Sequence, residues 1–173
     1  RKVIRSGAGS ALRRDPLKTG RILAAVRRAT ARPLTFKIRS GWDSDSVNFL
    51  EIGRIAAAEG VDAVTLHPRS RAQMFGGSAD WAQTRTLKET LPIPVIGSGD
   101  LFNAEAIKTM FDQTGCNAAM IGGGGYGNPW IVRKALQLLA GEPASEPGLD
   151  ERRATASEHL ALCLEIFGPR KTL

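Results

Sequence analysis

Short apolar runs and amphipathic stretches alternate along most of this chain. Four runs of aliphatic and β-branched residues predict strands at 34–38 (LTFKI), 63–67 (AVTLH), 93–97 (IPVIG) and 118–121 (AAMI). Their starts are separated by about 25–30 residues, the length of one βα unit. Stretches with helical spacing fill the intervals. Strict alternation of strand and helix predicts a parallel sheet with helices packed outside it.

Local signals support several of the intervening helices. The clearest apolar stripes are Ile22, Val26 and Ala29, and Ile107, Met110 and Phe111. Asn103 is placed to cap the second of these helices. The polar segment 43–46 offers caps for a helix over 47–59, which Gly60 would end.

The pattern changes after about residue 140. Residues 141–149 contain two prolines and two glycines and predict a linker. Apolar positions from 156 to 167 then follow helical spacing with no strand after them. We therefore expect residues 1–140 to form four βα units, the second half of a TIM-type (β/α)₈ barrel, and residues 150–173 to begin a helical domain. An open four-stranded sheet is the alternative, but both of its edges would need cover. The chain is expected to be part of a longer protein.

Composition narrows the class of protein. The 173 residues carry Lys+Arg 24 against Asp+Glu 17, a formal charge of +7. This balance suits a phosphate-rich partner such as nucleic acid, although a solvated basic surface would explain it equally well. Two cysteines argue against a disulfide framework and a cysteine-ligated zinc site. With no apolar run long enough to span a membrane, a cytoplasmic protein is expected.

The ends of the predicted strands carry the candidate chemistry, because active residues of parallel barrels lie there. Lys37 and His67 end adjacent strands and suggest a pocket for an anionic, planar cofactor, although either residue alone would have a structural role more often. Glycine-rich segments at 97–100 and 122–125 follow the last two strands and suit a phosphate, unless they are only tight turns. No cluster of residues has metal-ligand spacing.

One glycine motif is misleading. Residues 122–127 (GGGGYG) satisfy G-x-G-x-x-G after a strand, as in dinucleotide-binding folds. Such a fold needs a second strand with an acidic end ~20 residues further on. A helix, a linker and another helix follow instead, so the surrounding sequence argues against a dinucleotide-binding fold.

Five ordered blocks resemble the tRNA-dihydrouridine synthases, flavin enzymes that reduce uridine in tRNA. The blocks are 7–16 (GAGSALRRDP), 37–42 (KIRSGW), 67–81 (HPRSRAQMFGGSADW), 93–101 (IPVIGSGDL) and 125–131 (GYGNPWI). The resemblance covers nearly all of residues 1–167. It implies a barrel with FMN at its mouth, followed by a small helical domain that helps to hold tRNA.

The resemblance also implies residue roles. Lys37 and His67 would lie along the isoalloxazine ring, with Lys37 stabilising negative charge near N1 and O2. The FMN phosphate would be held by Ser98, Gly99, Asp100, Gly122 and Gly123. The side facing tRNA would carry Arg39, Arg69 and Arg71. The family reaction passes hydride from NADPH to FMN and then to uracil C6, while a cysteine protonates C5.

The chain departs from the family pattern at three points. The family's cysteine lies in a loop directly before the stretch that begins here at Arg1, so no catalytic residue is assigned in this chain. The first half of the barrel is also expected upstream. Ser98 and Gly123 replace the usual asparagine and arginine. Two alternatives therefore stay open: an FMN barrel that acts on a small molecule, and a non-catalytic RNA-binding half-barrel. The arginine-rich mouth and the charge of +7 favour tRNA over the small molecule.

Overall fold

The computed structural model describes residues 7–169 and confirms the predicted α/β alternation. The strands are β1 (Thr35–Arg39), β2 (Ala63–His67), β3 (Val95–Ser98) and β4 (Ala118–Met120). They form one sheet in the order β1-β2-β3-β4, and every pair is parallel. The register places Arg39 beside His67 and Ser98 beside Met120. The carboxyl ends of all four strands therefore meet at one edge, as in part of a TIM barrel.

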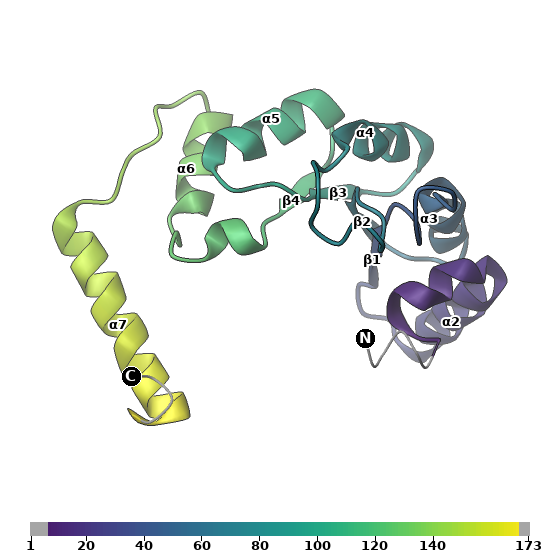
Figure 1. Ribbon diagram of the computed structural model, residues 1–173, viewed down its shortest axis with the longest axis horizontal. Helices are drawn as coiled ribbons and strands as arrows, with labels where there is room; N and C mark the ends of the chain where they lie inside the picture. The colour runs from purple at the N-terminus through teal and green to yellow at the C-terminus, as the bar shows by residue number, and fades with distance from the viewer. Residues whose placement is uncertain (1–6, 170–173) are drawn as a thin grey trace.

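Helices cover one face of this sheet. The helices of the described residues are η1 (Gly9–Arg14), α2 (Pro16–Ala29), α3 (Phe49–Ala58), α4 (Trp81–Thr90), α5 (Ala104–Thr114), η2 (Gly123–Gly125), α6 (Ile131–Leu139) and, away from the sheet, α7 (Leu149–Phe167). Figure 1 shows α2 to α6 as an outer arc with the strands on its inner side. Among the described residues, no helix covers the inner face of the sheet.

The core lies between the sheet and the arc. Alternate strand residues such as Ile38, Val64 and Leu66 are buried against the helices, whereas Lys37 and His67 occupy the opposite face. Gly97 belongs to the helix-facing set. A Cβ there would lie 2.7 Å from Met110 Sδ, so Gly97 is a packing position and not part of the predicted anion site.

Two predicted helices differ in detail from the structure. In α2, Ile22 and Val26 are exposed, and the buried face is Thr19, Gly20 and Leu23. Gly20 allows the close approach to α3, because a Cβ there would lie 3.1 Å from Ile55 Cγ2. The fit between α2 and α3 thus determines which face of α2 is buried, and the positions of the apolar residues alone do not predict it.

The segment 43–46 does not cap α3. Ser46 Oγ donates to Asp43 Oδ1, so these residues close their own turn. The amides of Asn48 and Phe49 donate instead to the carbonyl of Ser40. Asn103 does cap α5 as predicted, since its side chain accepts the Ala106 N–H at 2.7 Å.

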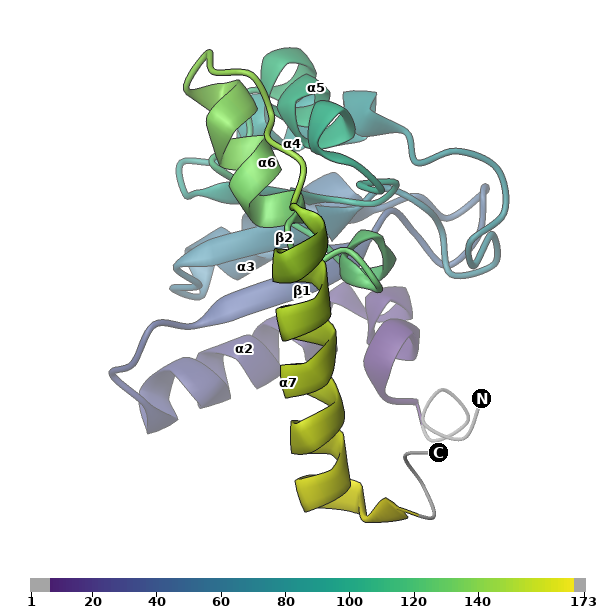
Figure 2. The same cartoon turned by 90° about the vertical axis from the view of Figure 1, so that its left-hand side faces the viewer.

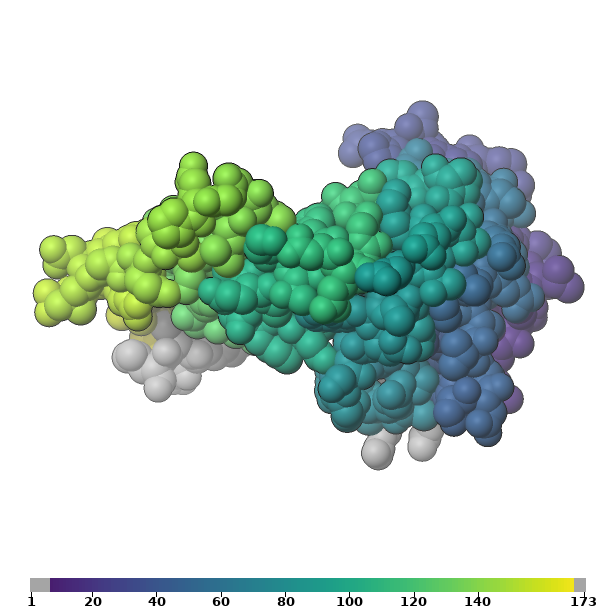
Figure 3. All heavy atoms as spheres, turned by 90° about the horizontal axis from the view of Figure 1, so that it is seen from above, coloured from purple at the N-terminus to yellow at the C-terminus, as the bar shows by residue number. Residues whose placement is uncertain are grey.

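Helix α7 stands apart from the sheet and its helices. No residue of α7 is buried. Figures 2 and 3 show it projecting away from the rest of the described chain. Its first turn is tied to the α6 region through Glu151, which accepts hydrogen bonds from Trp130 Nε1 and Arg133. Among residues 7–169, no helix is long and apolar enough to cross a membrane.

Candidate functional site

A cleft of about 600 Å³ opens at the carboxyl ends of the four strands. Its lining is Lys37, Arg39, His67, Arg69, Phe75, Ser98 to Phe102 and Met120 to Gly124. The lining therefore contains every residue to which the family resemblance assigns a role except Arg71, whereas Gly97 and Gly125 of the two predicted glycine segments do not line it. Sequence reasoning missed the apolar walls, Phe75, Phe102 and Met120. The two-residue period of β4 places Met120 on the inner face, but nothing local marks the other two.

Lys37 and His67 face the cleft from adjacent strands. The Lys37 ammonium has no hydrogen-bond or ion-pair partner within residues 7–169. Desolvation, followed by repulsion from Arg39, holds the Lys37 pKa below its usual value. The same two effects, with the charges of Lys37 and Arg69, lower the pKa of His67 to about 4, against an opposing effect of Asp100. His67 is therefore neutral at pH 7.

The tautomer of His67 follows from its neighbour. Arg69 Nη1 lies 3.4 Å from His67 Nε2. A guanidinium can only donate, so Nε2 faces it as an acceptor and the ring proton is assigned to Nδ1.

Arg69, which the resemblance places on the tRNA-facing side, is a buried side chain of the cleft wall. Its side chain is 4% exposed and forms a two-point ion pair with Asp100. It also donates to the carbonyls of Gly76 and Gly77. The oxygens that accept these hydrogen bonds belong to the loop after β2 and to the turn after β3. Arg69 therefore shapes the cleft wall and does not project into solvent.

The turn after β3 has an unusual backbone. Gly99 has φ 103° and Asp100 has φ 58°, a left-handed value that costs a non-glycine residue free energy. The Ala79 N–H donates to Asp100 Oδ2 at 2.7 Å, and Trp81 Nε1 donates to the Gly99 carbonyl at 3.1 Å. A Cβ at Gly99 would lie 2.9 Å from His67 Cδ2, so only glycine permits this approach to the histidine ring.

Desolvation raises the pKa of Asp100, but the hydrogen bonds from Arg69 and the Ala79 N–H, with the charge of Arg69, outweigh it and leave that pKa below its usual value. Asp100 is therefore ionised at neutral pH. Its oxygens already accept from Arg69 and Ala79.

The glycine loop after β4 meets this turn directly. A Cβ at Gly124 would collide with the carbonyl oxygen of Leu101. Gly122 and Gly123, in contrast, have open space where a Cβ would point. The amides of Gly99, Gly122 and Gly123 donate no hydrogen bond to any residue in 7–169. Free donors from two loops thus line one cleft, an arrangement that suits an anion.

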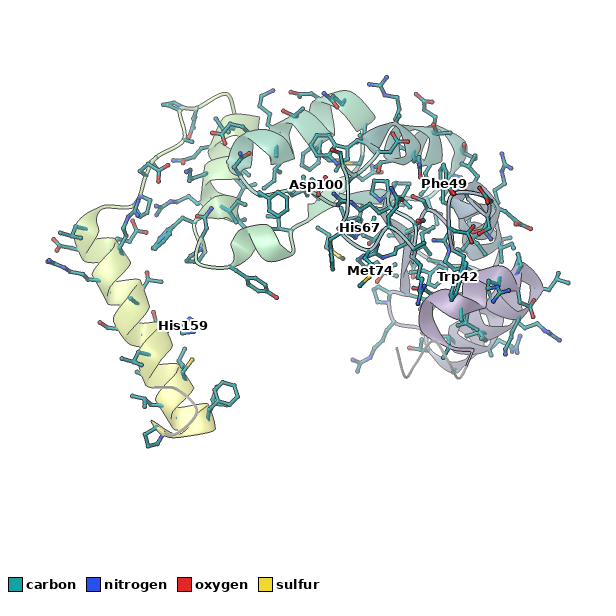
Figure 4. All side chains as sticks on the ribbon, in the orientation of Figure 1. Trp42, Phe49, His67, Met74, Asp100 and His159 are labelled. Atoms are coloured by element: carbon teal, nitrogen blue, oxygen red, sulfur yellow. The ribbon has the colours of Figure 1, made fainter. Side chains whose placement is uncertain are left out.

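The other two predicted arginines, Arg39 and Arg71, lie on different sides of the cleft boundary. Arg39 lines the cleft, donates to the carbonyls of Ser70 and Met74, and lies 5.5 Å from the Phe75 ring. Arg71 lies outside the cleft, over the ring of Trp42 at 4.7 Å. Figure 4 shows Trp42 on the α2 side of His67.

The charges around the cleft are predominantly positive. Lys37, Arg39 and Arg69 line it with one carboxylate, Asp100, which is already paired with Arg69. No group of three or more metal-ligating side chains occurs among the described residues. Positive charge, free amides and apolar walls together suit a ligand with a flat apolar part and an anionic group.

The chain is also similar to the proteins of one known family. The family model described as Dihydrouridine synthase (Dus) matches residues 1–173. The chain is 40% identical over 172 residues to tRNA-dihydrouridine synthase B of Pasteurella multocida, covering 99% of this chain and 52% of that protein. It is 41% identical over 175 residues to a probable tRNA-dihydrouridine synthase of Mycobacterium leprae, covering 98% and 46%.

A third relative is tRNA-dihydrouridine synthase B of Yersinia pestis, 37% identical over 172 residues, covering 99% of this chain and 54% of that protein. The chain thus spans about half the length of these curated relatives. Since the family model matches the chain from end to end and the described residues form the expected cleft, this chain belongs to the dihydrouridine synthase family.

Proposed function

We propose that the protein containing this chain reduces uridine to 5,6-dihydrouridine in tRNA, with FMN as its flavin and NADPH as the source of hydride. The observation that carries the proposal is the cleft in which Lys37 and His67 face the free amides of Gly99, Gly122 and Gly123. The relatives named as tRNA-dihydrouridine synthases support the reaction and its RNA substrate. Such a role would place the protein with tRNA in the cytoplasm.

The cleft residues fit FMN. The cleft volume of about 600 Å³ lies in the usual range for a cofactor site. Met120 and Phe102 supply apolar surface for a flat ring. The phosphate would be held by the turn at 98–100 and by Gly122 and Gly123, whose lack of a side chain lets the backbone approach it.

Each charged residue has a role in this proposal. Bound FMN, once reduced by NADPH, would supply the hydride that adds to C6 of uracil. Lys37 would place its unpaired ammonium beside negative charge near N1 and O2 of the ring. Neutral His67 would hydrogen-bond along the ring without adding a charge. Arg39 and Arg71 would contact tRNA, whereas Arg69 would act by holding Asp100.

We further propose that this chain forms the second half of the barrel and the start of the helical tRNA-binding domain. Within the described residues, β1 and β4 are each paired along one edge only, and the inner face of the sheet lacks cover. A preceding segment would supply the missing strands and the cysteine that protonates C5. These features and the half-length match to the relatives support the proposal.

The test compares this 173-residue chain with the protein extended by its preceding segment, each supplied with FMN, NADPH and a tRNA transcript. Dihydrouridine should form with the extended protein and not with the chain alone. Replacing the cysteine of the preceding segment by alanine should lower the rate by about 10²–10⁴, the contribution typical of a positioned proton donor.

Other outcomes would contradict the proposal. An extended protein that binds flavin but reduces only a small molecule would favour that alternative. An extended protein that binds tRNA without flavin would favour a non-catalytic RNA-binding role. Comparable turnover by the 173-residue chain alone would contradict the division of the barrel.

A further inference from the structure

We infer that Arg14, Trp42 and Arg71, called here the Trp42 cluster, bind the phosphodiester backbone of an RNA strand outside the cleft. The inference rests on the proposed function for its RNA substrate. It assigns a contact site to residues that do not line the cleft.

The three side chains come from different parts of the chain and meet on one ring. The guanidinium carbons of Arg14 and Arg71 lie 5.3 and 4.7 Å from the centroid of Trp42. Such contacts with an indole are favourable for guanidinium groups. Neither guanidinium has a hydrogen bond or ion pair with any residue between 7 and 169. Both therefore keep their N–H donors available for a ligand.

The backbone fixes two members of the cluster side by side. The Arg71 N–H donates to the Gly41 carbonyl and the Ala72 N–H to the Trp42 carbonyl, each at 2.9 Å. Gly41 is itself confined, since a Cβ there would collide with the Ser46 carbonyl. The loops after β1 and β2 thus hold Trp42 and Arg71 before any ligand arrives.

Arg14 is held from the other side. Its neighbour Arg13 is buried, donates to Asn48 Oδ1 at 2.9 Å and accepts from Asn48 Nδ2 at 2.8 Å through its carbonyl. This reciprocal pair fixes η1 to the start of α3. A ligand at the cluster therefore loses little affinity to ordering of the protein.

The charges of the Trp42 cluster favour a phosphate as its ligand, because no carboxylate of the described residues neutralises the two arginines. Two guanidinium groups on one ring repel each other, and the attraction of both to an anion between them would offset that repulsion. Nearby Asp15 accepts the Lys18 N–H, and Asp43 accepts the Ser46 hydroxyl. Within residues 7–169 neither carboxylate forms an ion pair with Arg14 or Arg71. The planar donor fork of arginine matches phosphate oxygens. Hollows of about 450 and 490 Å³, both lined by Arg14 and Trp42, give a strand room to approach.

The position of the cluster suits an RNA strand that enters the cleft. Arg39, inside the cleft, donates to the carbonyl of Ser70, the residue directly before Arg71. The loop that carries Arg71 thus also forms a wall of the cleft. A nucleotide bound in the cleft could therefore have a neighbouring phosphate at the cluster.

The experiment measures the binding of fluorescein-labelled tRNA to the FMN-loaded extended protein over a series of KCl concentrations. The variants are Arg14→Gln, Arg71→Gln and the double variant, with Arg28→Gln, an exposed arginine of α2, as the matched control. Each cluster variant should weaken binding several-fold at low salt. Each should also reduce the slope of log Kd against log[KCl] by about 0.7–0.9 for every phosphate that the variant no longer neutralises. Arg28→Gln should change neither quantity.

The outcomes separate this inference from the proposed function. A double variant with the wild-type salt slope and retained flavin absorbance would overturn the inference, together with the tRNA contact proposed for Arg71, and leave the proposed reaction standing. A reduced slope in a protein that forms no dihydrouridine would support the RNA contact and contradict the proposed function. Equal effects of Arg28→Gln and the cluster variants would show only diffuse attraction and overturn the inference.

Discussion

Arg69 and Asp100 form a two-point ion pair across the carboxyl end of the sheet, with Nη1–Oδ1 at 2.6 Å and Nη2–Oδ2 at 2.9 Å. The pair joins the loop after β2 to the turn after β3, which are two walls of the cleft. Because Asp100 has a left-handed backbone, the ion pair holds a conformation that the turn would adopt less readily alone.

Loss of this pair should destabilise the protein. Arg69→Met leaves the Asp100 carboxylate without its partner, so we expect the free energy of unfolding to fall by about 3 kcal/mol, as for other largely buried pairs. Urea denaturation measures the change. The matched control is Arg133→Met, which breaks an exposed ion pair with Glu151 and should cost less than about 1 kcal/mol. Equal losses in the two variants would contradict a special role for Arg69.

His67 should give the protein a pH-dependent stability. Its pKa is lowered from 6.5 to about 4 in the folded chain. Between these values the unfolded chain binds more protons, so the free energy of unfolding should rise with pH from about 4 to 6.5. Urea denaturation across this window should show a smaller rise for His67→Gln than for the wild type. Identical pH profiles for the two proteins would contradict the lowered pKa.

An arginine at 123 should strengthen phosphate binding. A side chain at Gly123 meets open space beside the cleft, so Gly123→Arg can place a charged donor there. We expect the affinity of the extended protein for FMN to rise about 10-fold, as for one added hydrogen bond to a charged group. Quenching of flavin fluorescence measures the affinity. Gly124→Arg is the control, since its Cβ would collide with Leu101 and should lower affinity. A fall in affinity for Gly123→Arg would place the phosphate elsewhere.

Lys37 should strengthen FMN binding through its unpaired ammonium. Lys37→Met retains the length of the side chain but removes its unpaired ammonium, so FMN should bind about 10-fold more weakly to the extended protein. The same fluorescence titration measures this effect. Lys108→Met is the control, because Lys108 pairs with Asp112 on the surface of α5. An unchanged affinity for Lys37→Met would remove Lys37 from the flavin site.

Residue patterns along the chain are sufficient to predict the alternation of strands and helices. A strand shows its buried face within a few residues, as Ile38, Val64 and Leu66 do. Helix ends are equally local, and the Asn103 cap and the left-handed Gly115 at the ends of α5 depend on residues within one turn. The placement of Lys37 and His67 at one edge follows from the same local signals, because parallel strands align their carboxyl ends.

Which of these residues pair and which remain free depends on contacts between segments that are distant in the sequence. Arg69 and Asp100 are 31 positions apart, and only the strand register brings their charges together. The buried face of α2 likewise depends on the fit of Gly20 against Ile55 in α3, and Gly97 became a packing position through Met110. Such contacts depend on shape and distance between segments remote in sequence. An arginine just after the end of a predicted strand can therefore become the buried support of a cleft.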